Sequence, residues 1–228
     1  MHAKPDLRVF LEWKIYRPDS VIATVIRLEN MEPHFKHILD TVEPLDDSIY
    51  GPRYRCAVTL KDGTHLPCVV LQSKQKVVEQ AKRRIRQEIN GDGPTGGDDP
   101  YGQIITTFVA QNNRINDYDV AAAEESKFAP PVELLRRIHG ETTMGWTGWV
   151  FEMTDGKKFA YGSSFTMEFF QLPDGYLFKD VAEVHNHSFL DSSGKLAKLE
   201  QGIYLPESYD IDNVLRERMY FSCAIAVG

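Results

Sequence analysis

The chain has 228 residues and a mass of 26.0 kDa, enough for one large domain or two small ones with a buried core. Apolar residues make up 42% and charged residues 26%, which excludes a fully disordered or collagen-like chain. No apolar run approaches the ~20 residues of a membrane span, and the first residues lack the apolar core of a signal peptide. Three cysteines are too few for a disulfide framework, so we expect a reducing, cytoplasmic location without membrane association.

The net charge of −7 is unevenly distributed along the chain. Residues 1–88 carry 15 Lys and Arg against 12 Asp and Glu, whereas residues 90–228 carry 11 against 21. Residues 90–102 contain five glycines and two prolines and have little apolar surface to bury. We therefore expect an α+β subdomain at 1–89, a Gly/Pro/Asp linker or loop at 90–102 and an acidic, aromatic-rich, mainly β subdomain at 103–228. One domain with a long surface loop is the alternative.

Apolar periodicity predicts the elements of the first half. Alternating apolar residues indicate a hairpin within residues 7–28. Pro33 opens a helix in which Phe35 and Ile38 follow at helical spacing. Ser73 caps a second helix that runs to about Ile89 and carries many Lys and Arg residues around an apolar stripe.

Two Asp–Gly turns predict two further hairpins, at Asp62–Gly63 and at Asp155–Gly156. A common buried face requires Leu60 to pair with Leu66, and Met153 with Phe159. This register needs a three-residue loop, residues 62–64 in the first hairpin.

In the second half, residues 104–110, 143–153, 158–170, 176–187 and 221–227 read as strands. Short helices are expected after Pro130 and near residues 210–215. The expected class is α+β, with antiparallel β-hairpins and sheets and a few packed helices.

The strongest chemical pattern is formed by Glu183, His185 and His187. Alternate residues of a strand share a face, so two imidazoles and a carboxylate could converge on a divalent metal, with Asp180 or Asp191 in supporting roles. Such ligand sets occur in hydrolytic zinc sites and oxidative iron sites. Spacing fixes no ligand rotamers, so solvated or carboxylate-paired histidines are the alternative. Apart from this metal, no cofactor is expected.

Aromatic residues concentrate between residues 142 and 178. Trp146 and one member of the adjacent pair Phe169 and Phe170 do not both fit the buried face, so we expect exposed aromatic residues here. Exposed aromatic residues act as interface anchors. Trp146, Phe169 and Phe170 are therefore the candidate partner-binding residues.

Two other groups favour structural roles. The three cysteines, Cys56, Cys68 and Cys223, lie among apolar neighbours, as expected of core residues rather than nucleophiles. The basic helix at 74–86 could contact phosphates. A pI of about 5.5 opposes nucleic-acid binding.

No nucleotide-binding, hydrolase or calcium-binding motif is present. The sequence therefore predicts a non-enzymatic, cytoplasmic protein-binding module whose acidic half docks on a basic partner surface, for example as an immunity-type inhibitor of a nuclease. The alternative is a metal-dependent hydrolase or oxygenase that uses Glu183, His185 and His187. The sequence leaves the oligomeric state open.

Overall fold

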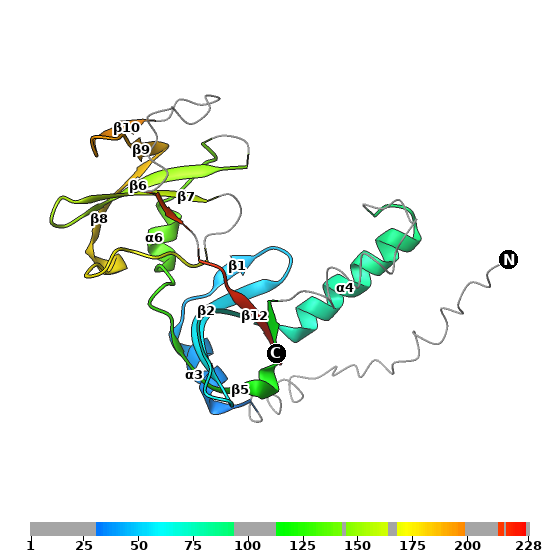
Figure 1. The fold of residues 1–228 in the computed structure, drawn as a ribbon. Coiled ribbons are helices and arrows are strands. Elements are labelled where there is room, and N and C mark those ends of the chain that lie inside the picture. The colour runs from blue at the N-terminus through cyan, green and yellow to red at the C-terminus, as the bar shows by residue number, and fades with distance from the viewer. Residues whose placement is uncertain are drawn as a thin grey trace.

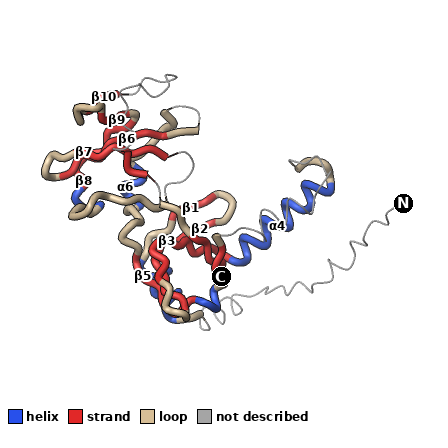
Figure 2. The backbone as a smooth tube through the Cα atoms, viewed as in Figure 1, coloured by secondary structure: helices blue, strands red, loops and turns tan. Residues whose placement is uncertain are grey.

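The strands of the chain gather into two groups, with few helices beside them (Figures 1 and 2). The computed structural model describes residues 31–93, 113–142, 145–163, 168–198, 214–216 and 218–226. The predicted hairpin at 7–28 and the predicted strand at 104–110 lie outside these residues.

Within the described ranges, the larger sheet has six strands in the order β1-β2-β3-β12-β4, with β5 also paired to β2. Its strands are β1 (Leu45–Asp47), β2 (Gly51–Leu60), β3 (His65–Ser73), β4 (Arg114–Ile115), β5 (Val120–Glu125) and β12 (Phe221–Ile225). The pairings among β1, β2, β3 and β5 are antiparallel, whereas β12 runs parallel to both β3 and β4.

A second sheet has four strands in the order β11-β7-β6-β8, and a separate hairpin pairs β9 with β10. These strands are β6 (Thr147–Met153), β7 (Lys158–Ser163), β8 (Val181–Asn186), β9 (Ser188–Leu190), β10 (Leu196–Lys198) and β11 (Val214–Arg216). The helices of the described residues are α3 (Pro33–Thr41), α4 (Lys74–Ile89) and α6 (Val132–Arg136), with 3-10 turns η2 (Asp117–Asp119) and η3 (Phe178–Asp180). The predicted α+β class with antiparallel hairpins is confirmed. None of the described helices has the length and apolar character needed to span a membrane.

Both Asp–Gly hairpins form with three-residue loops, but the predicted register is wrong. Leu66 pairs with Val58 and not with Leu60, and Phe159 pairs with Phe151 and not with Met153. Each loop begins one residue earlier than predicted. Leu60 donates its backbone N–H to the Thr64 carbonyl, and Met153 donates to Lys157, so the loops are residues 61–63 and 154–156. Gly63 and Gly156 have φ values of 87° and 84° and occupy the last loop position. A three-residue loop places its left-handed residue there, so glycine determines the register.

The core of the larger sheet lies between the sheet and α3. Phe35 and Ile38 of α3 pack against Cys56, Val58 and other apolar residues of β2, β3, β5 and β12. Pro33 begins α3 as predicted, because its missing N–H needs no partner in a first helical turn.

The second sheet buries its two faces differently. Trp149, Phe151 and Tyr161 on one face pack with α6 and Phe170. On the other face, the apolar residues Val150 and Ala160 pack with Leu190 of the β9–β10 hairpin. The polar residues beyond Val150 on this second face form the site described below.

The expected boundary at residues 90–102 does not coincide with the division between the sheets. Strands β4, β5 and β12 come from the second half of the sequence, yet they complete the sheet that β2 and β3 begin. Their acidic neighbours therefore lie beside the basic first half, and Asp117 pairs with Lys74 at 3.1 Å. The difference in charge between the sequence halves is thus not a difference between the two sheets.

Two short-range helix predictions have opposite outcomes. Helix α4 spans Lys74–Ile89, and the Ser73 side chain caps it by accepting from the Lys76 N–H. The predicted helix near residues 210–215 is wrong at its C-terminal end, because Val214–Arg216 form β11 and pair with β7. The pairing with a distant strand outweighs the local capping pattern.

Candidate functional site

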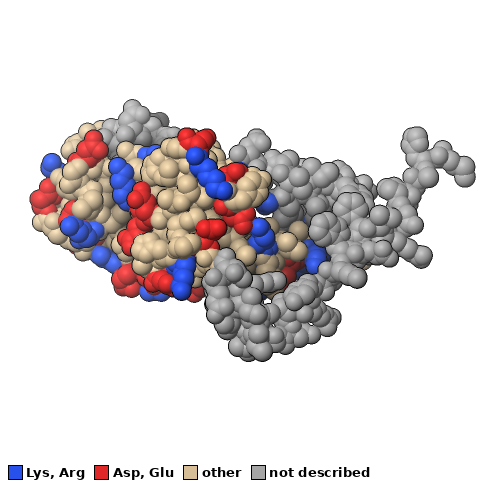
Figure 3. Space-filling view, turned by 90° about the horizontal axis from the view of Figure 1, so that it is seen from below, with Lys and Arg blue, Asp and Glu red and all other residues tan. Residues whose placement is uncertain are grey.

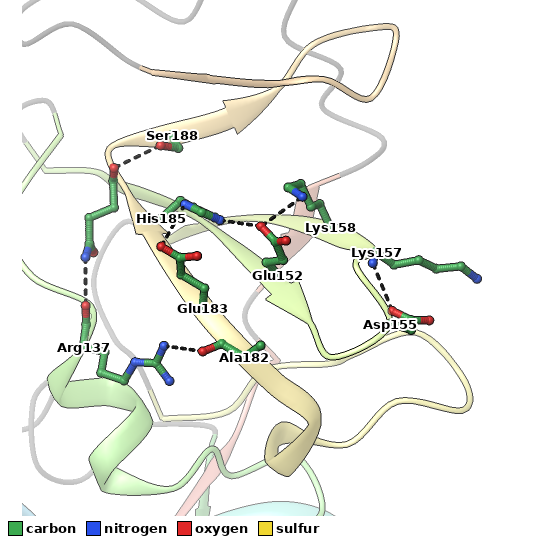
Figure 4. Close-up of polar contacts among 10 residues, drawn as sticks. Arg137, Glu152, Asp155, Lys157, Lys158, Ala182, Glu183, His185 and Ser188 are labelled. Atoms are coloured by element: carbon green, nitrogen blue, oxygen red, sulfur yellow. Dashed lines mark hydrogen bonds and ion pairs between the residues drawn. The ribbon is translucent and has the colours of Figure 1, made fainter.

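Polar side chains gather where β6, β7 and β8 lie side by side. Glu152 on the central strand β6 is directly opposite Lys158 of β7 and Glu183 of β8. His185 is opposite Val150, so it is the diagonal neighbour of Glu152. We call Glu152, Lys158, Glu183 and His185 the polar cluster (Figure 4).

Glu152 is the hub of the polar cluster. Its Oε2 lies 2.9 Å from Lys158 Nζ and 2.9 Å from His185 Nε2. The other ring nitrogen of His185, Nδ1, lies 3.8 Å from Glu183 Oε1. Hydrogen bonds from Lys158 and His185 hold the pKa of Glu152 below its usual range. The imidazole therefore lies between two carboxylates.

The prediction that His187 joins Glu183 and His185 is wrong. Strand β8 ends at Asn186, and His187 has a positive φ of 53°, so the alternation of faces stops before it. Its Nδ1 lies 3.1 Å from Thr142 Oγ1, and its ring contacts Gly140. His187 thus anchors the loop after α6 and contributes nothing to the polar cluster.

Glu152 takes the place expected of His187. One ligand atom each from Glu152, Glu183 and His185 lie within 4.8 Å of one another, a spacing that a divalent metal could bridge. Carboxylate and imidazole are ligands that zinc and manganese accept. The Lys158 ammonium opposes this use, because it already contacts Glu152 Oε2 and would repel a cation. A metal would have to displace it.

The proposed supporting carboxylates have structural roles instead. Asp180 accepts a hydrogen bond from the Leu177 N–H in η3. Asp191 accepts from the backbones of Ser193 and Lys195 in the turn between β9 and β10. Beside the polar cluster, an open depression of about 430 Å³ is lined by Gly156, Lys158, Phe159, Leu190 and Gly194.

The adjacent phenylalanines are both buried, so the expectation that one is exposed is wrong. Phe169 is 1% exposed and packs with Cys68 and Val70 of the larger sheet. Phe170 is 0% exposed and contacts the rings of Trp149 and Tyr161 in the other core. Neighbouring residues can both be buried here because each side of this segment faces a different core.

Trp146 is half-buried. Its indole ring lies against Gly162, where an added Cβ would collide with it. This glycine on β7 therefore allows the ring to approach the strand closely. The partner-binding role of Trp146 stays a prediction.

The cysteines are three buried free thiols. Burial raises the pKa of Cys56 far above its usual range, and raises that of Cys223 to about 12. Burial also raises the pKa of Cys68, although Arg218 opposes the shift. A thiol held in its neutral form is a poor nucleophile.

A buried ionic group between the two sheets escaped sequence analysis. Arg53 Nη1 lies 2.6 Å from Glu168 Oε1, and Arg55 Nη1 donates a hydrogen bond to the backbone carbonyl oxygen of Glu168 at 3.3 Å. Arg55 is 3% exposed, and burial lowers its pKa to about 10 against the effect of the Glu168 charge. Because Glu168 precedes Phe169, this group and the two aromatic rings hold the sheets together.

A second missed feature is the side of β5 that has no partner strand among the described residues. We call residues 117–125, which form η2 and β5, the acidic edge. Among the described strands β5 pairs with β2 alone, so alternate backbone N–H and C=O groups point away from the sheet. Ala121, Ala122, Glu124 and Glu125 are all exposed, and Tyr118 is 67% exposed.

The carboxylates of the acidic edge are only partly neutralised. Asp117 pairs with Lys74, and Asp119 accepts from Asn116. No described Lys or Arg lies within 4.0 Å of Glu124 or Glu125. The pattern of small residues next to acidic ones at 121–125 was visible in the sequence, but only the strand pairing shows that it lies at a sheet edge.

No family model, curated protein or solved structure matches the chain.

Proposed function

We propose that the chain is a non-enzymatic protein-binding module whose acidic edge binds a basic segment of a partner protein. The observation that carries the proposal is the exposure of four of the six β5 side chains on a strand with one described neighbour. An open strand edge offers backbone hydrogen bonds to an added strand. Two alanines allow close approach, and Glu124 and Glu125 select for Lys and Arg.

An immunity-type inhibitor is the specific form of this proposal. In that form, the acidic edge covers the cation-lined active site of a nuclease and excludes its polyanionic substrate. A cytoplasmic site of action belongs to the same proposal, because the three free thiols suit a reducing compartment.

Site-specific photo-crosslinking tests the proposal. A benzophenone amino acid replaces Ala122 on β5 or, as a control, the exposed Ala182 on β8. In host cells we expect position 122, and not position 182, to capture one protein with a basic surface. Glu124→Lys with Glu125→Lys should abolish that adduct. Equal capture at both positions, or none at position 122, would refute the proposal.

The second candidate function is the metal-dependent hydrolase or oxygenase, now built on Glu152, Glu183 and His185. The convergence of their ligand atoms within 4.8 Å favours it. If a metal binds there, Lys158→Met removes the competing ammonium and should tighten Zn²⁺ or Mn²⁺ binding at least about tenfold in calorimetric titration. Glu152→Gln should abolish binding. Identical titrations for wild type and both variants would eliminate this candidate.

A further inference from the structure

Helix α4 presents one long polar side to solvent. At about 100° per residue, a run of polar residues falls within a sector of about 140° around the helix axis. All of them are exposed: Gln75, Lys76, Glu79, Lys82, Arg83, Arg86, Gln87 and Asn90. We call this sector the basic side of α4. It lies opposite the side of the helix that carries the buried residues Val77 and Glu88.

Cations dominate the basic side. Its one carboxylate, Glu79, already pairs with Lys76 at 3.1 Å. Lys82, Arg83 and Arg86 follow within little more than one helical turn, and no described carboxylate lies within 4.0 Å of them. Three neighbouring cations that face solvent fit a surface on which anions are closely spaced.

The far end of the basic side lies away from both sheets. Helix α4 packs on the larger sheet at its first turn, where Lys74 pairs with Asp117 and Val77 is buried. From there it points away from the sheet (Figure 1). Arg86 lies about 14 Å beyond Val77 along the helix axis. Charges in solution are screened beyond about 10 Å at 0.1 M salt, so the net charge of −7 repels a polyanion only weakly here.

We propose that the basic side of α4 binds duplex DNA through its phosphates, without sequence specificity and independently of the acidic edge. B-DNA carries one negative charge per about 1.7 Å of its axis, which is dense enough to engage three neighbouring cations. Its major groove is about 12 Å wide and admits an α-helix, whereas that of duplex RNA is too narrow. A membrane would need the opposite side of α4, where Glu88 is 0% exposed.

The salt dependence of DNA binding tests the proposal in the full chain. Fluorescence anisotropy of a labelled, mixed-sequence DNA duplex is measured from about 50 to 200 mM salt. Each phosphate contact contributes about −0.9 to the slope of log K against log salt, so three cations predict a slope of about −3. Lys82→Gln with Arg83→Gln and Arg86→Gln should weaken binding at least about tenfold and bring the slope close to zero.

Lys36→Gln with Lys61→Gln and Lys198→Gln is the control, because it makes the same charge change at exposed positions outside α4. It should keep the wild-type affinity and slope, and circular dichroism verifies the helix content of both variants. Equal weakening by both triple variants would show an effect of net charge alone and overturn the proposal. So would a wild type that does not bind the duplex, or that binds an RNA duplex or anionic vesicles as tightly.

Discussion

Gly63 and Gly156 hold left-handed backbone conformations at the last position of their loops. The space where a Cβ would project is open at both, so a substitution meets backbone strain and no clash. We expect Gly63→Ala or Gly156→Ala to lower the free energy of unfolding by about 1 kcal/mol. Asparagine tolerates this conformation, so Gly→Asn should cost less. Urea unfolding measures both, and equal losses for Ala and Asn would contradict the strain argument.

The buried thiols make stability depend on alkaline pH. Burial raises the pKa of Cys56 and Cys223 in the folded chain, whereas a thiol in the unfolded chain has a pKa of about 8.5. Above that pH the unfolded state loses protons that the folded state keeps, so stability falls as pH rises. From about pH 8 to 10 we expect each thiol to contribute a loss of about 2 kcal/mol.

Urea unfolding at several pH values measures this loss. Cys56→Ala with Cys223→Ala should lower stability at neutral pH, because it leaves cavities, yet flatten its decline above about pH 8. An equally steep decline in the variant would show that the thiols do not cause it.

Single residues also show where sequence reasoning about the site succeeds. Glu183 and His185 share a face because strand residues alternate, and this could be read from their spacing. The departure of His187 could not, because a positive φ at a non-glycine residue leaves no pattern in the sequence. Glu152 joins them through a cross-strand contact between residues 31 positions apart, and spacing does not specify strand pairing.

At the scale of elements, Glu168 is the link between the two sheets. Its carboxylate compensates the charges of the partly buried Arg53 and the buried Arg55. Glu168→Gln leaves Arg53 with only the longer contact to Asp47 at 3.6 Å and removes the nearest charge from the buried Arg55, so we expect a loss of about 3 kcal/mol in unfolding free energy. Replacing Arg53, Arg55 and Glu168 together with Met, Met and Leu should recover most of it. Thermal unfolding tests this, and a triple variant less stable than Glu168→Gln would contradict it.

Elements whose partners are close in sequence were predictable. The helices α3 and α4 and both Asp–Gly hairpins follow from caps, turns and periodicity, which act over a few residues. The C-terminal strand was predicted too, but its place between β3 and β4 was not. That place depends on which distant strands bury the same core, so the subdomain boundary drawn from composition misses it.

For the whole molecule, charge is better described by surface position than by sequence half. Acidic and basic side chains interleave over the face seen in Figure 3, with no large patch of one sign. Long-range attraction by the net charge of −7 is therefore a weak basis for partner choice. A local group such as the acidic edge carries the specific contact that we propose.

Affinity for the crosslinked partner, measured with charge-reversed variants, tests the central claim most directly. Glu124→Lys with Glu125→Lys alters the acidic edge, whereas Glu141→Lys with Asp174→Lys makes the same charge change at exposed positions elsewhere. We expect the first pair to weaken binding more than about tenfold and to reduce its dependence on salt. The second pair should bind like wild type. Equal weakening by both pairs, or none by the first, would contradict a docking site at the acidic edge.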